Sequence, residues 1–144
     1  MFYKISVRKR KELLSRIIDQ IPNEGKISFE GTFLGKIKPK LIPSQSGNGI
    51  LTRTTYFPIQ DFWIFELNQQ TKEYIKKDLL NSIGLRNNVV HVQIEVDSQL
   101  LFVSNDGFDV DGVSLTEMQS INLDFLQILK SDGIIWDFKI TEVF

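Results

Sequence analysis

Cysteine is absent from the 144 residues of this chain, and histidine occurs once, at His91. The lack of cysteine excludes disulfides, thiolate nucleophiles and every zinc site that uses a cysteine ligand. A single histidine excludes metal sites built from several histidines. The fold must therefore be held together by the packing of its core.

Long hydrophobic runs are absent as well, and no run approaches the ~20 apolar residues that a membrane-spanning helix needs. The opening residues, MFYKISVRKRK, bring charges before any hydrophobic stretch is complete, which is not the pattern of a secretory signal. We therefore expect a cytoplasmic protein. Alanine is missing too, while Ile, Leu, Phe, Asn and Lys are abundant, a bias that suits an AT-rich genome. No glycine-rich phosphate loop, dinucleotide fingerprint or serine nucleophile elbow is found, so no cofactor is expected.

What is present is the composition of an ordinary globular protein, with 42% hydrophobic and 24% charged residues. The length favours one domain over residues 1–144. Helical periodicity or capping residues predict three helices, at about 7–20, 70–83 and from the capping box Ser114-x-x-Glu117 to Gly133. Alternating or apolar runs predict strands at about 26–33, 54–59, 61–67, 89–96, 100–104 and 134–140.

The order of these elements predicts an α+β fold. Only the segment 61–96 is long enough for a parallel crossover, so we expect a mixed, mostly antiparallel sheet of about six strands with three helices, one N-terminal, one in the middle and one near the C-terminus. The run DFWIFEL at 61–67 is apolar on both faces, which is typical of a central strand. Residues 36–52, KIKPKLIPSQSGNGILT, predict a flexible surface loop.

Two strand patterns make specific predictions about side-chain direction, and together with the other elements they predict a core. In the strand 89–96, His91, Gln93 and Glu95 should point to solvent. In the last strand, IIWDFKI, we expect Trp136, Phe138 and Ile140 to face the core. We predict one core that contains Phe29, Phe33, Trp63, Phe65, Ile94, Phe125 and Trp136.

The densest acidic stretch is SNDGFDVDG at 104–112. Neither glycine places an acid at both ends of an EF-hand loop, which needs Asp at position 1 and Glu at position 12. The D-x-D of Asp109 and Asp111 also occurs in some metal-dependent sugar transferases. We favour a hairpin in which 101–103 and 108–110 are strands and Asp109 and Asp111 share the outer face. No metal ligand set is predicted.

Other residues offer alternative chemistry. His91 could act alone as a general base beside a carboxylate. Asp137-Phe138-Lys139 resembles the acid-x-Lys pair of restriction-type nucleases, whose second metal-binding acid would have to be Asp124 or Asp111. These residues define an alternative hypothesis, a small metal-dependent enzyme that uses Asp109, Asp111 and Asp137.

The chain is positive in its first part and negative in its second. Residues 1–60 hold 11 Lys or Arg and 4 Asp or Glu, a net charge of +7, while residues 61–144 have a net charge of −8. A basic run, Arg8, Lys9, Arg10 and Lys11, could contact phosphates, and nucleic-acid binding through it is a further alternative.

Our leading hypothesis from the sequence is a non-catalytic protein-binding module whose acidic surface meets a basic protein partner. Its most concrete form is a bacterial immunity protein that neutralises a toxin, for instance a nuclease, because such an inhibitor must mask a surface that attracts phosphates. The residues expected to contact the partner are Asp106, Asp109, Asp111, Glu95 and Asp97.

Overall fold

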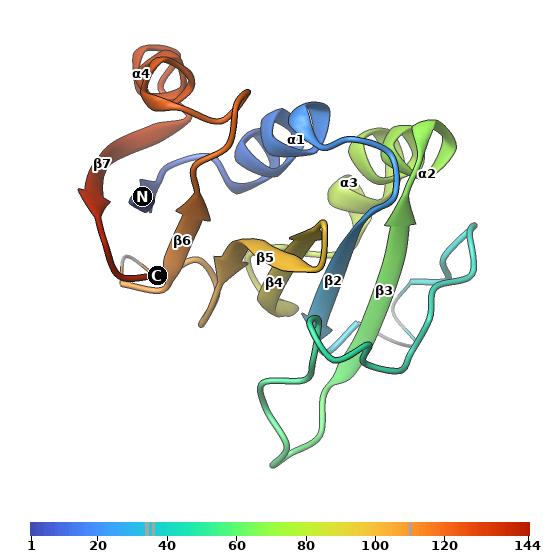
Figure 1. The fold of residues 1–144 in the computed structure, drawn as a ribbon. Coiled ribbons are helices and arrows are strands. Elements are labelled where there is room, and N and C mark those ends of the chain that lie inside the picture. Colours follow the sequence, from blue (N-terminus) through green and yellow to red (C-terminus); the bar gives the residue numbers. More distant parts are fainter. Residues whose placement is uncertain (34, 36, 110) are drawn as a thin grey trace.

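A seven-stranded antiparallel sheet forms the centre of the protein in the computed structural model, which describes residues 1–33, 35, 37–109 and 111–144 (Figure 1). The strand order is β3-β2-β4-β5-β6-β1-β7. The strands are β1 Phe2–Val7, β2 Gly25–Gly31, β3 Asp61–Leu67, β4 Val89–Val96, β5 Gln99–Ser104, β6 Val113–Thr116 and β7 Ile135–Thr141. The predicted α+β class, with a mostly antiparallel sheet and three helical regions, is confirmed.

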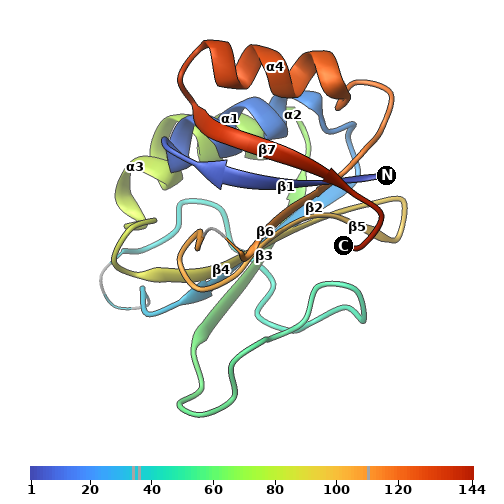
Figure 2. The ribbon, with the colours of Figure 1, turned by 90° about the vertical axis from the view of Figure 1, so that its left-hand side faces the viewer.

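The helices lie on one side of the sheet, and residues 48–55 of the segment between β2 and β3 lie on the other (Figure 2). They are α1 Arg10–Gln20, a middle helical region made of α2 Gln69–Tyr74, the π-helix η1 Ile75–Leu79 and α3 Leu80–Ser82, and α4 Leu123–Ser131. The middle region confirms the predicted helix at 70–83. Asn68 caps it, since its side chain accepts a hydrogen bond from the Thr71 N–H, and Gly84 follows it with a φ of +78°.

Two helix boundaries differ from the prediction. The first helix starts at Arg10 because the residues before it, FYKISV, form β1, with Tyr3 and Ile5 buried. The capping box at Ser114 is wrong, because Ser114 belongs to β6 and the last helix is capped by Asn122, which accepts from the Phe125 N–H at 3.1 Å. Tertiary pairing therefore overrides two local signals.

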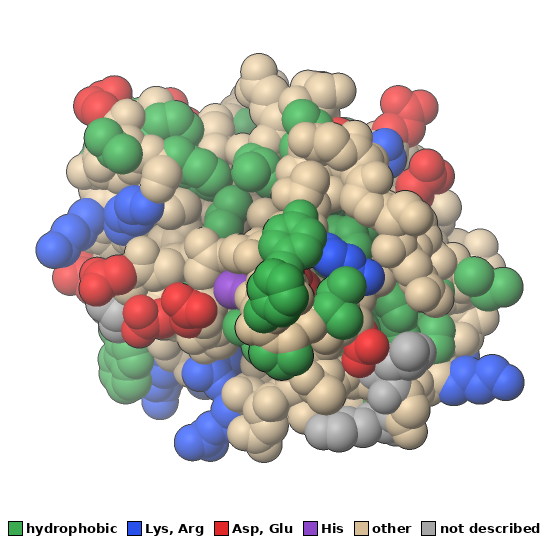
Figure 3. All heavy atoms as spheres, turned by 90° about the horizontal axis from the view of Figure 1, so that it is seen from below, with side chains coloured by type: hydrophobic (Ala, Val, Ile, Leu, Met, Phe, Trp, Pro, Cys, Tyr) green, Lys and Arg blue, Asp and Glu red, His purple; other side chains and the backbone are tan. Residues whose placement is uncertain are grey.

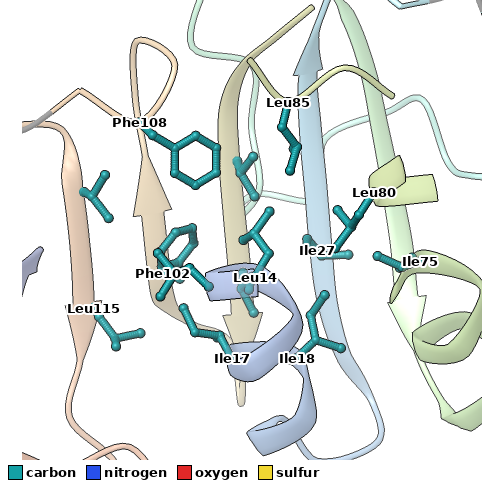
Figure 4. Packing of buried hydrophobic residues seen from close by; sticks show 14 of the residues in the cluster. Leu14, Ile17, Ile18, Ile27, Ile75, Leu80, Leu85, Phe102, Phe108 and Leu115 are labelled. Atoms are coloured by element: carbon teal, nitrogen blue, oxygen red, sulfur yellow. The ribbon is translucent and has the colours of Figure 1, made fainter. Parts of the chain in front are cut away.

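The core fills the space between the helices and the sheet (Figure 4). Leu14, Ile17 and Ile18 of α1 face the sheet, with Ile17 toward Phe102 and Leu115 and Ile18 toward Ile27. Each such side chain contributes roughly 1.5–3 kcal/mol when it is fully buried. The amphipathic stripe predicted for the first helix is thus the stripe that packs on the sheet.

Five of the seven predicted core residues, Phe29, Phe33, Trp63, Phe65 and Ile94, are buried together. Phe125 is partly buried against them. The prediction is wrong for Trp136, which is 62% exposed, and the same strand leaves Ile140 52% exposed. β7 is an edge strand with no described strand beyond it, and these two side chains lie outside the core cluster.

The position of β3 also differs from the prediction. The strand is buried on both faces as expected, yet it is the other edge of the sheet and not a central strand. Its second face is covered by residue Leu51, which packs on Phe62 and Ile64. The expected strand at 54–59 is not formed, and its only pairing among the described residues is an isolated bridge between Tyr56 and Ile59.

Candidate functional site

The acidic loop, residues 105–112, joins β5 to β6. Its ends are held together because the Asn105 N–H donates to the Gly112 carbonyl at 2.9 Å. It exposes three carboxylates to solvent, those of Asp106, Asp109 and Asp111. β5 does form a hairpin, but its partner is β6 and not the predicted strand at 108–110.

Phe108 corrects the prediction that residues 108–110 form a strand. It has a φ of +66°, outside the strand region, and only 6% of its surface is exposed. Its ring is buried in the core, so it anchors the middle of the acidic loop while the neighbouring carboxylates face water. The expected strand position of Val110 lies outside the described residues.

The five predicted partner contacts do not form one patch. Asp97 lies in the turn between β4 and β5, at the far end of β5 from the acidic loop, which is about 20 Å for six residues. Glu95 is only 7% exposed and accepts a hydrogen bond from Asn48 Nδ2 at 2.8 Å. The expectation that Glu95 points to solvent is therefore wrong, and Asp106, Asp109 and Asp111 remain as one group.

His91 and Gln93 are buried for the same reason as Glu95, which corrects their predicted exposure. Residues 48–55 lie over this face of the sheet and bind its polar side chains. The Thr52 N–H donates to Gln93 Oε1 at 3.3 Å, and Thr55 Oγ1 lies 3.0 Å from His91 Nε2. Within the described part of the chain, His91 Nδ1 has no hydrogen-bond partner.

Glu30 also holds residues 48–55 against this face of the sheet. It stands opposite His91 in the ladder between β2 and β4 and is 2% exposed. Its two carboxylate oxygens accept hydrogen bonds from the backbone N–H groups of Thr54 and Thr55, at 2.7 and 2.8 Å. The buried charge thus fixes the backbone that leads into the next exposed feature.

That feature is the hydrophobic tip, residues 56–59, which the sequence analysis treated as a strand. Tyr56, Phe57 and Ile59 are 59%, 95% and 68% exposed. The run Tyr-Phe-Pro-Ile, four apolar residues in succession in the connection between β2 and β3, was the signal that could have identified it. Four consecutive apolar residues held in water are a typical mark of a contact surface.

The structure brings together some of the residues named in the metal-dependent enzyme hypothesis. A hollow of about 240 Å³ opens between β1, β7 and the acidic loop, and Asp111, Asp137, Lys4 and Lys139 are among the residues that line it. Asp109 is not among these lining residues. Asp124 lies in the first turn of α4, away from the hollow.

The Asp137 carboxylate makes two polar contacts with neighbouring groups. The Phe138 N–H donates to its Oδ1 at 2.9 Å, and Lys130 Nζ lies 3.1 Å from the same oxygen. These two contacts, in that order, lower the pKa of Asp137 below its usual value. Among the described residues, no group of three or more His, Cys, Asp or Glu side chains is arranged to hold a metal ion.

Two cations of the basic run stack on different aromatic rings. The Arg8 guanidinium lies over Trp136, 5.0 Å from the ring centroid, and that of Arg10 lies over Phe108 at 5.7 Å. Only Lys9 and Arg8 of the four are classed as exposed, while Arg10 and Lys11 are half-buried. Arg8, Lys9, Arg10 and Lys11 therefore do not stand on the surface as one free cationic cluster.

No protein-family model, curated protein or solved structure matches this chain. In the part of the chain that the structure describes, no helix combines the length and the apolar character needed to cross a membrane. The functional argument therefore rests on the geometry of the hydrophobic tip and the acidic loop.

Proposed function

We propose that the chain is a non-catalytic protein-binding module that meets a basic partner through the hydrophobic tip and the acidic loop. In its most concrete form it is a bacterial immunity protein that neutralises a toxin with a positively charged surface. The observation that carries this proposal is the common attachment of the two exposed features to β4.

Consecutive residues of β4 hold both features. The Gly107 N–H of the acidic loop donates to the Val90 carbonyl at 2.8 Å, and His91 contacts Thr55 at the base of the tip. Figure 3 shows hydrophobic side chains projecting from the underside of the protein, with acidic side chains on the same face. The two features thus belong to one side of the molecule.

Such a surface has the two parts that protein interfaces combine. Aromatic residues at the centre of an interface supply most of the binding energy, and Tyr56 and Phe57 are placed to do so. Exposed carboxylates nearby steer a basic partner and reject an acidic one. Asp106, Asp109 and Asp111 are such carboxylates, and they belong to the half of the chain with a net charge of −8.

The immunity form of the proposal follows from the chemistry of the partner. A nuclease toxin attracts phosphates, so the surface around its active site is positive. An inhibitor that covers this surface needs carboxylates for recognition and an apolar group that excludes water from the centre of the contact. The tip and the acidic loop together supply both.

The test is co-expression with the toxin candidate encoded beside the gene for this chain, with cell growth as the readout. We expect the wild type to restore growth. Phe57→Ser and the double variant Asp109→Asn/Asp111→Asn should each weaken binding of the purified toxin at least tenfold, and the loss for the double variant should shrink as salt rises.

The matched control is Asp97→Asn/Glu142→Gln, which removes two exposed charges outside the acidic loop and the tip. It should protect cells and bind the toxin as the wild type does. Full protection and unchanged affinity in both the Phe57 and the Asp109/Asp111 variants would overturn the proposal.

A further inference from the structure

The edge strand β7 presents an unusual amount of apolar surface. Trp136 and Ile140 are 62% and 52% exposed, and Ile128 of the neighbouring helix α4 is 53% exposed. In the sheet order, β7 follows β1 and has no described strand on its other side, as Figure 1 also shows. This edge borders the hollow that Asp111 of the acidic loop also lines.

At the centre of β7, the Phe138 N–H is bonded to a side chain of its own strand, and this side chain would turn away when a second strand pairs there. The Phe138 N–H donates to the side chain of Asp137, which is exposed, and not to a backbone carbonyl of β1. In an antiparallel ladder, alternate residues turn their N–H and C=O groups toward opposite neighbours. Phe138 is thus a residue whose backbone polar groups face the open edge.

We propose that β7 pairs with β7 of a second copy of this chain, antiparallel and centred on Phe138. The two sheets then become one continuous sheet across a two-fold axis. In this register, Asp137 of each copy stands opposite Lys139 of the other. Trp136 stands opposite Ile140 in the same way, so the exposed apolar side chains cover one another.

Charge selects this register over its neighbours. Moving the centre of pairing by one residue toward the N-terminus places Asp137 opposite itself, and moving it by one residue toward the C-terminus places Lys139 opposite itself. Like charges directly opposite each other destabilise a sheet, whereas opposite charges stabilise it. The pairing centred on Phe138 joins each Asp137 to a Lys139.

Lys139 has a further reason to take an acidic neighbour. Within the chain it stands opposite Lys4 in the ladder between β1 and β7. The carboxylate of Asp137 from the second copy would offset this pair of positive charges. In the dimer, each Lys139 thus gains a carboxylate neighbour from the second copy.

The space beside the strand accommodates the second copy's side chains. An open hollow of about 530 Å³ lies between α4 and β7, lined by Gln127, Lys130, Ser131, Asp137 and Phe138. In the proposed dimer, the apolar side chains of the incoming strand would lie beside it. Their burial supplies the hydrophobic contribution to association.

The experiment measures the molar mass in solution by light scattering and sedimentation, for the wild type at about 100 μM, where a weak dimer is populated by mass action. We expect twice the chain mass of 16.7 kDa. Asp137→Lys and Lys139→Asp should each be monomeric, because each places like charges opposite one another. Mixing these two variants should restore the dimer mass, because every pair across the axis is again of opposite charge.

The double variant Asp137→Lys/Lys139→Asp, which exchanges the charges within one chain, should also form a dimer. Both residues are exposed, so circular dichroism should show the same fold for all variants as for the wild type. A monomeric wild type at this concentration, or single-charge variants that remain dimeric, would overturn the proposal. A mixture that stays monomeric would exclude the register centred on Phe138.

Discussion

Thr55 Oγ1 lies 3.0 Å from Nε2 of His91, on a face of β4 that its alternating pattern predicts to be in water. The contact shows that the polar residues of this face bind another part of the chain. Glu30, beside His91 in the ladder, makes the same use of its carboxylate. The polar face is thus an internal contact that fixes residues 48–55 and, through them, the hydrophobic tip.

Glu30→Gln should lower the free energy of unfolding by about 1–3 kcal/mol, because the amide nitrogen would face a backbone N–H that now donates to a carboxylate oxygen. Urea unfolding measures the change. The control is Glu66→Gln on β3, whose side chain is exposed and should change the stability by less than about 0.5 kcal/mol. Equal effects of the two substitutions would contradict the role of Glu30.

The two tryptophans should respond very differently to truncation. Trp63 is 1% exposed and packs edge-on against Phe33 at 4.5 Å between ring centroids. Trp63→Ala should cost about 3–5 kcal/mol, whereas Trp136→Ala should cost about 0.5–1 kcal/mol, the size of an exposed cation–π contact with Arg8. Denaturant midpoints test this, and similar losses for both variants would show that the packing is wrong.

Tyr3 should make stability depend on pH in the alkaline range. Burial, followed by the hydrogen bond to Glu117 and that carboxylate's charge, raises the pKa of Tyr3 to about 12. The unfolded chain releases this proton near pH 10, so the stabilising effect is complete below about pH 10 and is lost as the pH rises toward about 12. Tyr3→Phe should therefore lose less stability than the wild type over this interval, measured by urea unfolding at each pH. Parallel curves would contradict the assignment.

Divalent metals should leave the melting temperature unchanged. Asp109 and Asp111 are exposed, and the described residues contain no group of three potential ligands. A ligand that binds the folded state raises stability in proportion to its binding. A rise with calcium, magnesium or manganese in the wild type, absent in Asp109→Asn/Asp111→Asn, would favour the metal-dependent enzyme instead.

Limited proteolysis tests the predicted flexibility of residues 36–52. Trypsin should cut after Lys40 before it cuts after Arg53, because the backbone around Arg53 is tied to the sheet through Thr52, Thr54 and Thr55. Ile42, close to Lys40, is 95% exposed. First cleavage within the middle helical region, residues 69–82, would contradict the predicted location of the flexible segment.

Local sequence predicted those parts of the fold whose contacts are close in the chain. The stripe of Leu14, Ile17 and Ile18 identified the first helix, and Asn68 and Gly84 marked the bounds of the middle one, because capping and helical periodicity act within a few residues. Alternation likewise located β2 and β4, and apolar runs located β3 and β5. The class and approximate number of elements followed from these signals.

The same signals failed where a distant segment changed the environment. Alternation fixed which residues of β4 share a face, but whether Glu95 and His91 meet water depended on residues 48–55, far away in sequence. Strand order made β7 an edge and left Trp136 exposed.

The sequence by itself therefore determined the helices, most of the strands, the α+β class and the position of the acidic residues along the chain, since propensity and periodicity are local properties. Only the tertiary structure decided that Asp106, Asp109 and Asp111 lie apart from Asp97, that the polar face of β4 is covered, and that the apolar residues 56–59 project into water. The physical reason is that burial depends on which segments meet across the sheet, and that choice is made by the packing of the whole chain.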